Sequence, residues 1–98
     1  MAADQILAEV RAILIEIIGA EYAMSLHIGM DTSFDADLEL ESIEFVRLAM
    51  RLTERYGDRV DFVAFLATKD LDAIIEMKIG ELVTYIANRL ALAGAIDG

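Results

Sequence analysis

Hydrophobic residues recur with the period of an α-helix at the start of the chain. Within residues 4–18 the apolar side chains fall on two adjoining faces and the charged residues lie elsewhere. The apolar set is Ile6, Leu7, Val10, Ile13, Leu14, Ile17 and Ile18. This spacing predicts an amphipathic helix. Asp4 is its expected N-cap and Gly19 its expected end.

Residues 42–56 form a second periodic segment, with three kinds of surface. The stripe expected to face the core consists of Phe45, Leu48, Ala49, Leu52 and Tyr56. The polar stripe consists of Glu44, Arg47, Arg51 and Arg55. A third group, here called the apolar shoulder, lies beside the core stripe and consists of Ile43, Val46 and Met50. The pattern predicts a second amphipathic helix that ends at Gly57.

The rest of the chain predicts shorter elements and one more long helix. Residues 20–41 have no sustained period and are rich in turn residues, so we expect a long loop. Short helical turns are expected at 62–66 and 71–75, and a last helix at 79–92 with a frayed tail at 93–98. The inward residues of this last helix should be Leu82, Val83, Ile86 and Leu90.

These elements predict an all-α fold in a single domain over residues 1–98: a bundle of three main helices and a short one. The chain has no proline and six glycines, which leaves room for long uninterrupted helices. The residues expected between the helices are Phe34, Leu52, Phe65, Ile75 and Ile86.

Composition narrows the function classes. The chain has no cysteine, which excludes disulfides, thiolate catalysis and Cys-based metal sites. Its N-terminus lacks a basic region, and its most apolar stretch, residues 12–20, is too short to span a bilayer and contains Glu16. We therefore expect a cytoplasmic protein that does not insert into membranes.

Charge is distributed unevenly along the chain. The net charge is −10, and residues 1–46 hold ten acids and one base, which leaves −1 for residues 47–98. Residues 31–44, here called the acidic segment, hold six acids and no base. Such a surface repels nucleic acid and suits a partner with a basic surface, although a solvated acidic loop has the same composition.

Ser42 stands where the acidic segment meets the second predicted helix. A serine in this place commonly serves as a helix N-cap. A Ser-His-Asp arrangement is disfavoured, because the only histidine is His27 in the long loop. The alternating acids from Asp31 to Glu39 are similar to a calcium-binding loop, but Ala36 replaces its turn glycine and Ser42 its bidentate glutamate. No metal site is therefore expected.

The stretch from Asp31 to Leu48 resembles the signature of the acyl carrier protein family. In that signature a Phe precedes Asp-Leu-Gly-Leu-Asp-Ser-Leu, which leads into a helix. The corresponding residues here are Phe34, Asp37, Leu38, Glu39, Leu40, Glu41, Ser42 and Ile43. Residues 78–86 are similar to the start of the family's last helix. With the matching order of elements, the resemblance covers nearly the whole chain.

The resemblance implies a carrier rather than an enzyme. A phosphopantetheinyl transferase would join 4'-phosphopantetheine to Ser42, and the arm would carry acyl groups as thioesters in fatty acid, polyketide or related lipid biosynthesis. Partners would also include acyl-transferring or acyl-elongating enzymes with basic docking surfaces, and the carrier itself would be a monomer. Two alternatives stay open: an unmodified acidic interaction module, and an aminoacyl or peptidyl carrier.

The same resemblance implies a recognition surface around Ser42, on which we expect the apolar shoulder to be exposed. The recognition residues would be Asp37, Glu39, Glu41, Ile43, Glu44, Val46, Arg47, Met50 and Glu54. Glu39 replaces the family's Gly, which reaches backbone angles that Glu reaches only at a cost. Arg47 replaces a common acid. Arg47, Arg51 and Arg55 either pair with Glu44, Glu54 or solvent, or Arg47 changes partner choice by repelling enzymes built for an acidic helix.

Overall fold

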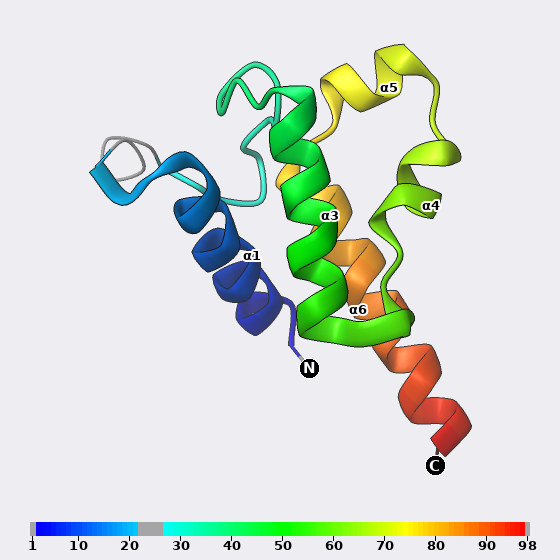
Figure 1. The fold of residues 1–98 in the computed structure, drawn as a ribbon. Coiled ribbons are helices and arrows are strands. Elements are labelled where there is room, and N and C mark those ends of the chain that lie inside the picture. The colour runs from blue at the N-terminus through cyan, green and yellow to red at the C-terminus, as the bar shows by residue number, and fades with distance from the viewer. Residues whose placement is uncertain (1, 22–26, 98) are drawn as a thin grey trace.

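The computed structural model describes residues 2–21 and 27–97, and the side chains of residues 2–21 and 27–91. It is an all-α bundle (Figure 1), as predicted. The α-helices are α1 (Ala3–Ile18), α3 (Ser42–Tyr56), α4 (Phe62–Ala67), α5 (Leu71–Glu76) and α6 (Ile79–Asp97), and the short 3₁₀ turn η1 (Gly57–Arg59) follows α3. None of these helices is both long and apolar enough to cross a membrane, within the described part of the chain.

The helix ends follow local chemistry. Gly19 and Gly57 stop α1 and α3 as predicted, each with a positive φ (95° and 68°) that glycine adopts freely. The N-cap of α1 is Ala2, not Asp4. Asp4 lies in the first turn of the helix, where the helix dipole favours its negative charge. Helix α6 extends to Asp97, beyond the expected end at residue 92, because the alanine-rich sequence 91–96 favours helix.

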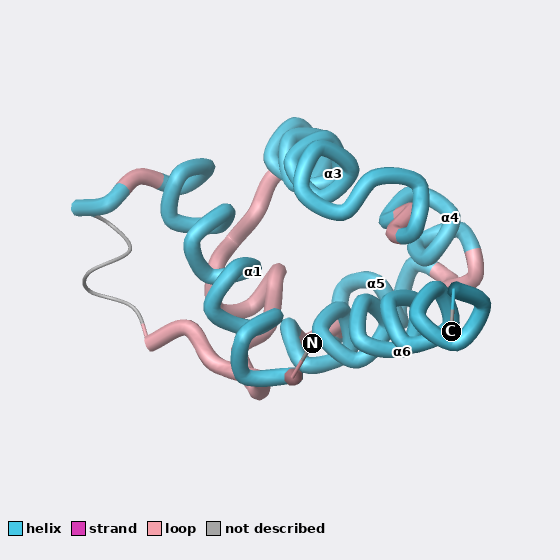
Figure 2. The backbone as a smooth tube through the Cα atoms, turned by 90° about the horizontal axis from the view of Figure 1, so that it is seen from below, coloured by secondary structure: helices cyan, strands magenta, loops and turns pink. Residues whose placement is uncertain are grey.

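The core lies between the three long helices (Figure 2), where α1 packs against both α6 and α3. Residues from each helix are fully buried there, and most were predicted: Ile6, Val10, Leu14, Leu48, Leu52, Leu82, Val83 and Ile86. Phe65 and Leu90 are half-buried and pack against this core. The predicted set of inward faces is therefore confirmed for all three long helices.

One predicted core residue is wrong. Ile75 is 44% exposed, and α5, which carries it, has no buried side chain. A six-residue helix makes fewer than two turns and cannot bury a full apolar face. Helix α5 is instead held at its start, where the Asp70 carboxylate accepts a hydrogen bond from the Ala73 N–H at 2.8 Å.

The described part of the long loop that leads into α3, residues 27–41, is docked onto the rest of the molecule. Its apolar residues Ile28, Phe34, Leu38 and Leu40 are buried. Its backbone also pairs with the chain that enters α6. The Phe34 N–H donates to the Met77 carbonyl at 3.2 Å, the Ile79 N–H to the Thr32 carbonyl at 2.8 Å, and the Gly80 N–H to the Met30 carbonyl at 2.8 Å.

Gly80 is required for this docking. A Cβ atom on residue 80 would lie 2.9 Å from the Met30 backbone oxygen, closer than real Cβ contacts. The glycine lets the loop backbone approach the first turn of α6, where the loop carbonyl satisfies an otherwise free helix N–H. The loop is thus fixed at both its core residues and its backbone, and it delivers the chain to the start of α3.

Candidate functional site

Ser42 is the first residue of α3 and is exposed. The N-cap of α3 is Glu41, and the Glu44 carboxylate folds back to accept a hydrogen bond from the Glu41 N–H at 3.0 Å. This is half of a capping box. The interpretation of Ser42 as the N-cap is therefore wrong. Within the described residues, its hydroxyl makes no hydrogen bond with another protein group.

The segment before Ser42 alternates between buried and exposed side chains. Leu38 and Leu40 are buried, whereas Asp37, Glu39 and Glu41 are exposed. The two leucines pull the backbone against the core, and the acids between them face solvent. The turn is also bonded within itself, since the Ser33 N–H donates to the Asp37 carboxylate at 2.7 Å. This period of two is visible in the sequence and could have revealed the buried leucines.

Glu39 has a φ of 52°, and it is the one non-glycine residue with a positive φ in the described backbone. It occupies the left-handed region, which costs an L-residue with a Cβ free energy that glycine does not lose. The expected backbone cost at this position is therefore confirmed. The surrounding contacts hold it there, because the Glu39 N–H donates to the Asp35 carbonyl at 3.0 Å and the next residue, Leu40, is buried.

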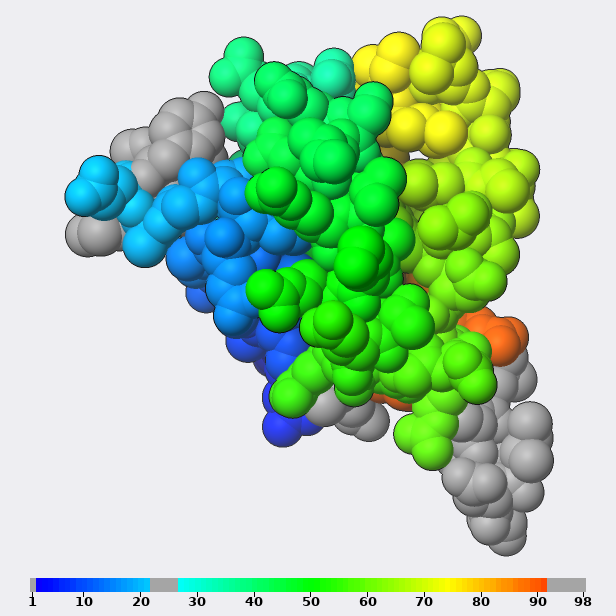
Figure 3. Space-filling model, viewed as in Figure 1, coloured from blue at the N-terminus to red at the C-terminus, as the bar shows by residue number. Residues whose placement is uncertain are grey.

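The apolar shoulder is exposed, as expected. Ile43, Val46 and Met50 are 57%, 54% and 60% exposed. Helix α3 runs down the front of the molecule in Figure 3, so this outer face is open to solvent. Three large apolar side chains at helical spacing, with exposed Glu41 and Glu54 nearby in the sequence, form the kind of patch that marks an interaction site.

The arginines of α3 differ in their partners. Arg51 lies between Glu54 and Glu16, with nitrogen–oxygen distances of 3.6 and 3.8 Å. Arg55 is paired with Glu9 of α1. The expected pairing with Glu54 is confirmed for Arg51, but Arg47 makes no ion pair with any described residue.

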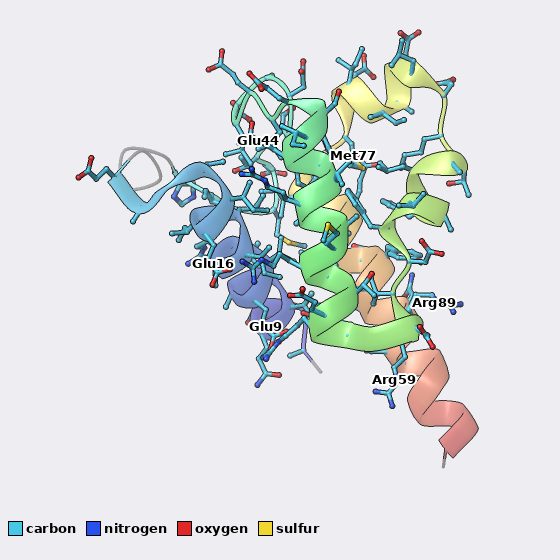
Figure 4. The ribbon with its side chains drawn as sticks, viewed as in Figure 1. Glu9, Glu16, Glu44, Arg59, Met77 and Arg89 are labelled. Atoms are coloured by element: carbon cyan, nitrogen blue, oxygen red, sulfur yellow. The ribbon has the colours of Figure 1, made fainter. Side chains whose placement is uncertain are left out.

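Glu9 joins α1 to the end of α3. It accepts hydrogen bonds from the Arg55 guanidinium and from the Tyr56 hydroxyl. The hydrogen bond from Arg55 is the main cause that holds the pKa of Glu9 below its ordinary value, and the bond from Tyr56 adds to it. Burial and the bond to Glu9 raise the pKa of Tyr56. In Figure 4 Glu9 and Glu16 lie on the side of α1 that borders α3.

The other candidate chemistry is dispersed. His27 is exposed in the loop. Among the described residues no group of three or more His, Cys, Asp or Glu side chains is placed to hold a metal ion. The acids of the would-be calcium loop instead project outward from the docked segment or, like Asp37, accept a backbone hydrogen bond.

A family model for the phosphopantetheine attachment site matches residues 8–77. The chain belongs to this family. The match confirms the resemblance to acyl carrier proteins, although residues 78–86, which also carry that resemblance, lie beyond it. No curated protein and no solved structure matches the chain. Family members are carriers that transferases modify with 4'-phosphopantetheine and that interact with enzymes.

The start of α3 fits such a phosphate-linked group. The first N–H groups of a helix lack intrahelical partners, and the helix dipole favours negative charge there. The Glu44 and Phe45 N–H groups already bond to the Glu41 carbonyl, at 3.0 and 3.1 Å. The N–H groups of Ser42 and Ile43 make no such bond in the described structure, so they can face a phosphate on Ser42.

Proposed function

We propose that this protein is an acyl carrier in fatty acid, polyketide or related lipid biosynthesis, with Ser42 as the attachment point of its 4'-phosphopantetheine arm. The observation that carries the proposal is the exposed Ser42 hydroxyl at the start of α3, which makes no hydrogen bond with the described part of the chain. The family match supports the cofactor, and the corresponding signature residue supports the choice of this serine.

In this proposal the chain presents a nucleophile but does not activate it. The Ser42 oxygen forms a bond to phosphorus as the pyrophosphate bond of coenzyme A breaks, and the nucleotide leaves. The serine proton passes to a base of the transferase, since no described side chain of this protein contacts the hydroxyl. When bound, the arm supplies a thiol that holds an acyl group as a thioester. The protein then acts as a substrate of enzymes rather than as an enzyme.

The exposed surface around Ser42 suits basic docking partners. The acids Asp37, Glu39 and Glu41 face solvent beside the apolar shoulder. Charges of one sign attract a partner of the other sign, and the apolar side chains contribute once water is excluded. We propose a phosphopantetheinyl transferase and acyl-transferring or acyl-elongating enzymes as partners of a monomeric cytoplasmic carrier.

The unmodified interaction module has one observation in its favour. Glu39 holds a strained backbone angle in the segment before Ser42, and Glu41 and Ile43 also depart from the family signature. A transferase that reads the backbone of this segment could reject it. The aminoacyl or peptidyl carrier shares the site and differs only in cargo.

Acyl loading separates these alternatives. The protein would be incubated with acetyl coenzyme A and a broad-specificity transferase, which delivers the arm already acylated. We expect the intact mass to rise by the acetylated arm, and hydroxylamine to remove only the acetyl group, as it cleaves a thioester. Elongation of the acetylated arm by acyl-elongating enzymes, together with no loading of the free-thiol arm by aminoacyl-activating domains, would support the acyl carrier. A folded protein that never gains mass would favour the interaction module.

A further inference from the structure

The exposed side of α3 reverses its charge within one helical turn. Glu41 and Glu44 stand at its start, with the acids of the preceding segment beside them. Arg47 follows three residues after Glu44, between two residues of the apolar shoulder in the sequence, Val46 and Met50. Any protein that covers the shoulder must therefore meet acids and a cation together.

A groove between α1 and α3 brings Arg47 into this surface. It has a volume of about 380 Å³ and is lined by Glu16, Ile17, Arg47, Met50, Arg51 and Glu54. Met50 belongs to the shoulder, so the groove and the shoulder are continuous. A partner side chain that packs on Met50 can also enter the groove.

Among the described residues, one charge in the groove lacks an internal partner. Arg51 lies between the carboxylates of Glu16 and Glu54 and balances both in part. Arg47 has no carboxylate of the described chain within ion-pair distance, so its positive charge remains for a binding partner. A partner that presents a carboxylate would therefore complement the charge of the groove.

We propose that Arg47 determines partner choice: it admits docking proteins that present a carboxylate to the second turn of α3 and cations to Glu41 and Glu44, and it disfavours those with an unbroken cationic surface. This inference rests on the proposed function, because the partners are enzymes that act on the carrier. A cation placed opposite Arg47 would be desolvated beside apolar side chains, where like-charge repulsion is least screened.

The test measures kcat/KM for the loading of Ser42 by a broad-specificity transferase, at low and high salt. Arg47→Glu reverses the charge at the proposed position. Arg59→Glu makes the same change at the other end of α3 (Figure 4), where Arg59 is exposed and its side chain makes no ion pair with the described residues. Unfolding curves would check that both variants fold.

With a transferase whose docking surface is cationic, Arg47→Glu should raise kcat/KM by about three- to tenfold at low salt. The substitution replaces one repulsion between like charges by one surface ion pair, and the expected rise is in the range of these two effects together. High salt should reduce the gain, because the charges are screened. Arg59→Glu should change kcat/KM by less than about twofold, because Arg59 follows the C-terminal end of α3 and only its long-range charge acts on a partner bound near Ser42.

Charge reversal on the transferase completes the test. Lysines on the docking face of the transferase would each be replaced by glutamate. If one of them lies opposite Arg47, its replacement should speed the loading of the wild-type carrier and slow the loading of Arg47→Glu, because the two residues interact directly. If kcat/KM for loading does not change in Arg47→Glu, or changes equally in Arg59→Glu, the proposed role of Arg47 in partner choice is wrong and the proposed function still stands. If no variant of the carrier is ever loaded, the proposed function fails and the charge selection fails with it.

Discussion

The two halves of α3 differ in what their side chains contact. In the C-terminal half, Arg51 and Arg55 are paired with Glu16 and Glu9 of α1. In the N-terminal half, Ser42, the apolar shoulder and Arg47 face solvent without a partner in the described structure. One helix is thus held to the fold by ion pairs at one end and exposed to solvent at the other.

This difference explains how a small domain can present an exposed serine without losing its shape. The clamped half fixes the helix against α1, and the docked loop fixes the chain that enters it. In the open half, the polar contact within the described chain is the capping bond between Glu44 and Glu41. Substitutions in the clamp and the loop should therefore change stability, whereas substitutions in the open half should change loading.

The largest effect on stability is expected from Gly80→Ala, which removes the close approach of the loop to α6. The added Cβ meets a backbone oxygen at 2.9 Å, so the loop must move. We expect a loss of about 2 kcal/mol, typical of overpacking at a tight site. Urea unfolding would measure it, and slower loading of Ser42 should accompany it.

The matched control is Gly29→Ala in the same loop. Among the described residues its Cβ would meet only the His27 side chain, at 3.4 Å, and that side chain can move. We expect a change of less than about 0.5 kcal/mol. Equal losses for the two variants would contradict the role given to Gly80.

A smaller effect is expected from Glu9→Gln, which breaks the ion pair between Glu9 and Arg55, here called the clamp. The variant loses a charge-assisted bond to Arg55, and we expect it to cost about 1 kcal/mol at neutral pH. Loading of Ser42 should be unchanged, because the clamp lies at the other end of α3. Glu54→Gln, which removes only an exposed pair, should cost less than about 0.5 kcal/mol.

The clamp also predicts a pH dependence. The pKa of Glu9 is lowered in the folded protein, so its stabilising effect is complete above the ordinary value of 4.5 and is lost as pH falls through the folded value. Protonated Glu9 is then close to Gln in charge. The stability difference between the wild type and Glu9→Gln should shrink as unfolding is measured from pH 6 to pH 3, and a constant difference would contradict the ion pair.

The smallest effect is expected from Glu39→Gly, which relieves the left-handed backbone. The strain relieved exceeds the extra chain entropy that glycine loses, and we expect a gain of about 0.5 kcal/mol in the free energy of unfolding. Glu41→Gly, at a φ of −85°, should give no gain. Thermal unfolding of the pair would decide, and a destabilised Glu39→Gly would contradict the strain.

The sequence predicted the elements with a strong period. The bounds of α3, its end at Gly57 and the exposure of the apolar shoulder follow from side-chain spacing and turn chemistry. The cap of α3 did not follow from the usual preference for serine at this position, because Glu41 is the N-cap and the Glu44 carboxylate bonds back to it. The Glu9–Arg55 pair joins residues far apart in the chain, which no local pattern reveals.

Short elements were less predictable for a physical reason. Ile75 has the apolar character of a core residue, but the length of α5 leaves it at the surface. Leu38 and Leu40 lie in a segment that was predicted to be a loop because it has no sustained period and many turn residues. In this segment only the alternation of buried and exposed positions indicates that the two leucines face the core. Burial in such segments depends on tertiary docking more than on local propensity.

The measurement that tests the central claim most directly is the intact mass of the wild type, Ser42→Ala and Ser33→Ala after incubation with coenzyme A and a broad-specificity transferase. Trypsin would leave all three serines in the peptide 12–47, whereas cleavage before aspartate isolates Ser42 in the peptide 37–57. Ser42→Ala should keep its stability within about 0.5 kcal/mol, because Ser42 is not the cap.

The account predicts that the wild type and Ser33→Ala gain one phosphopantetheine arm on the peptide 37–57, and that folded Ser42→Ala gains none. An arm on Ser42→Ala, or on another peptide of the wild type, would contradict the assignment of Ser42.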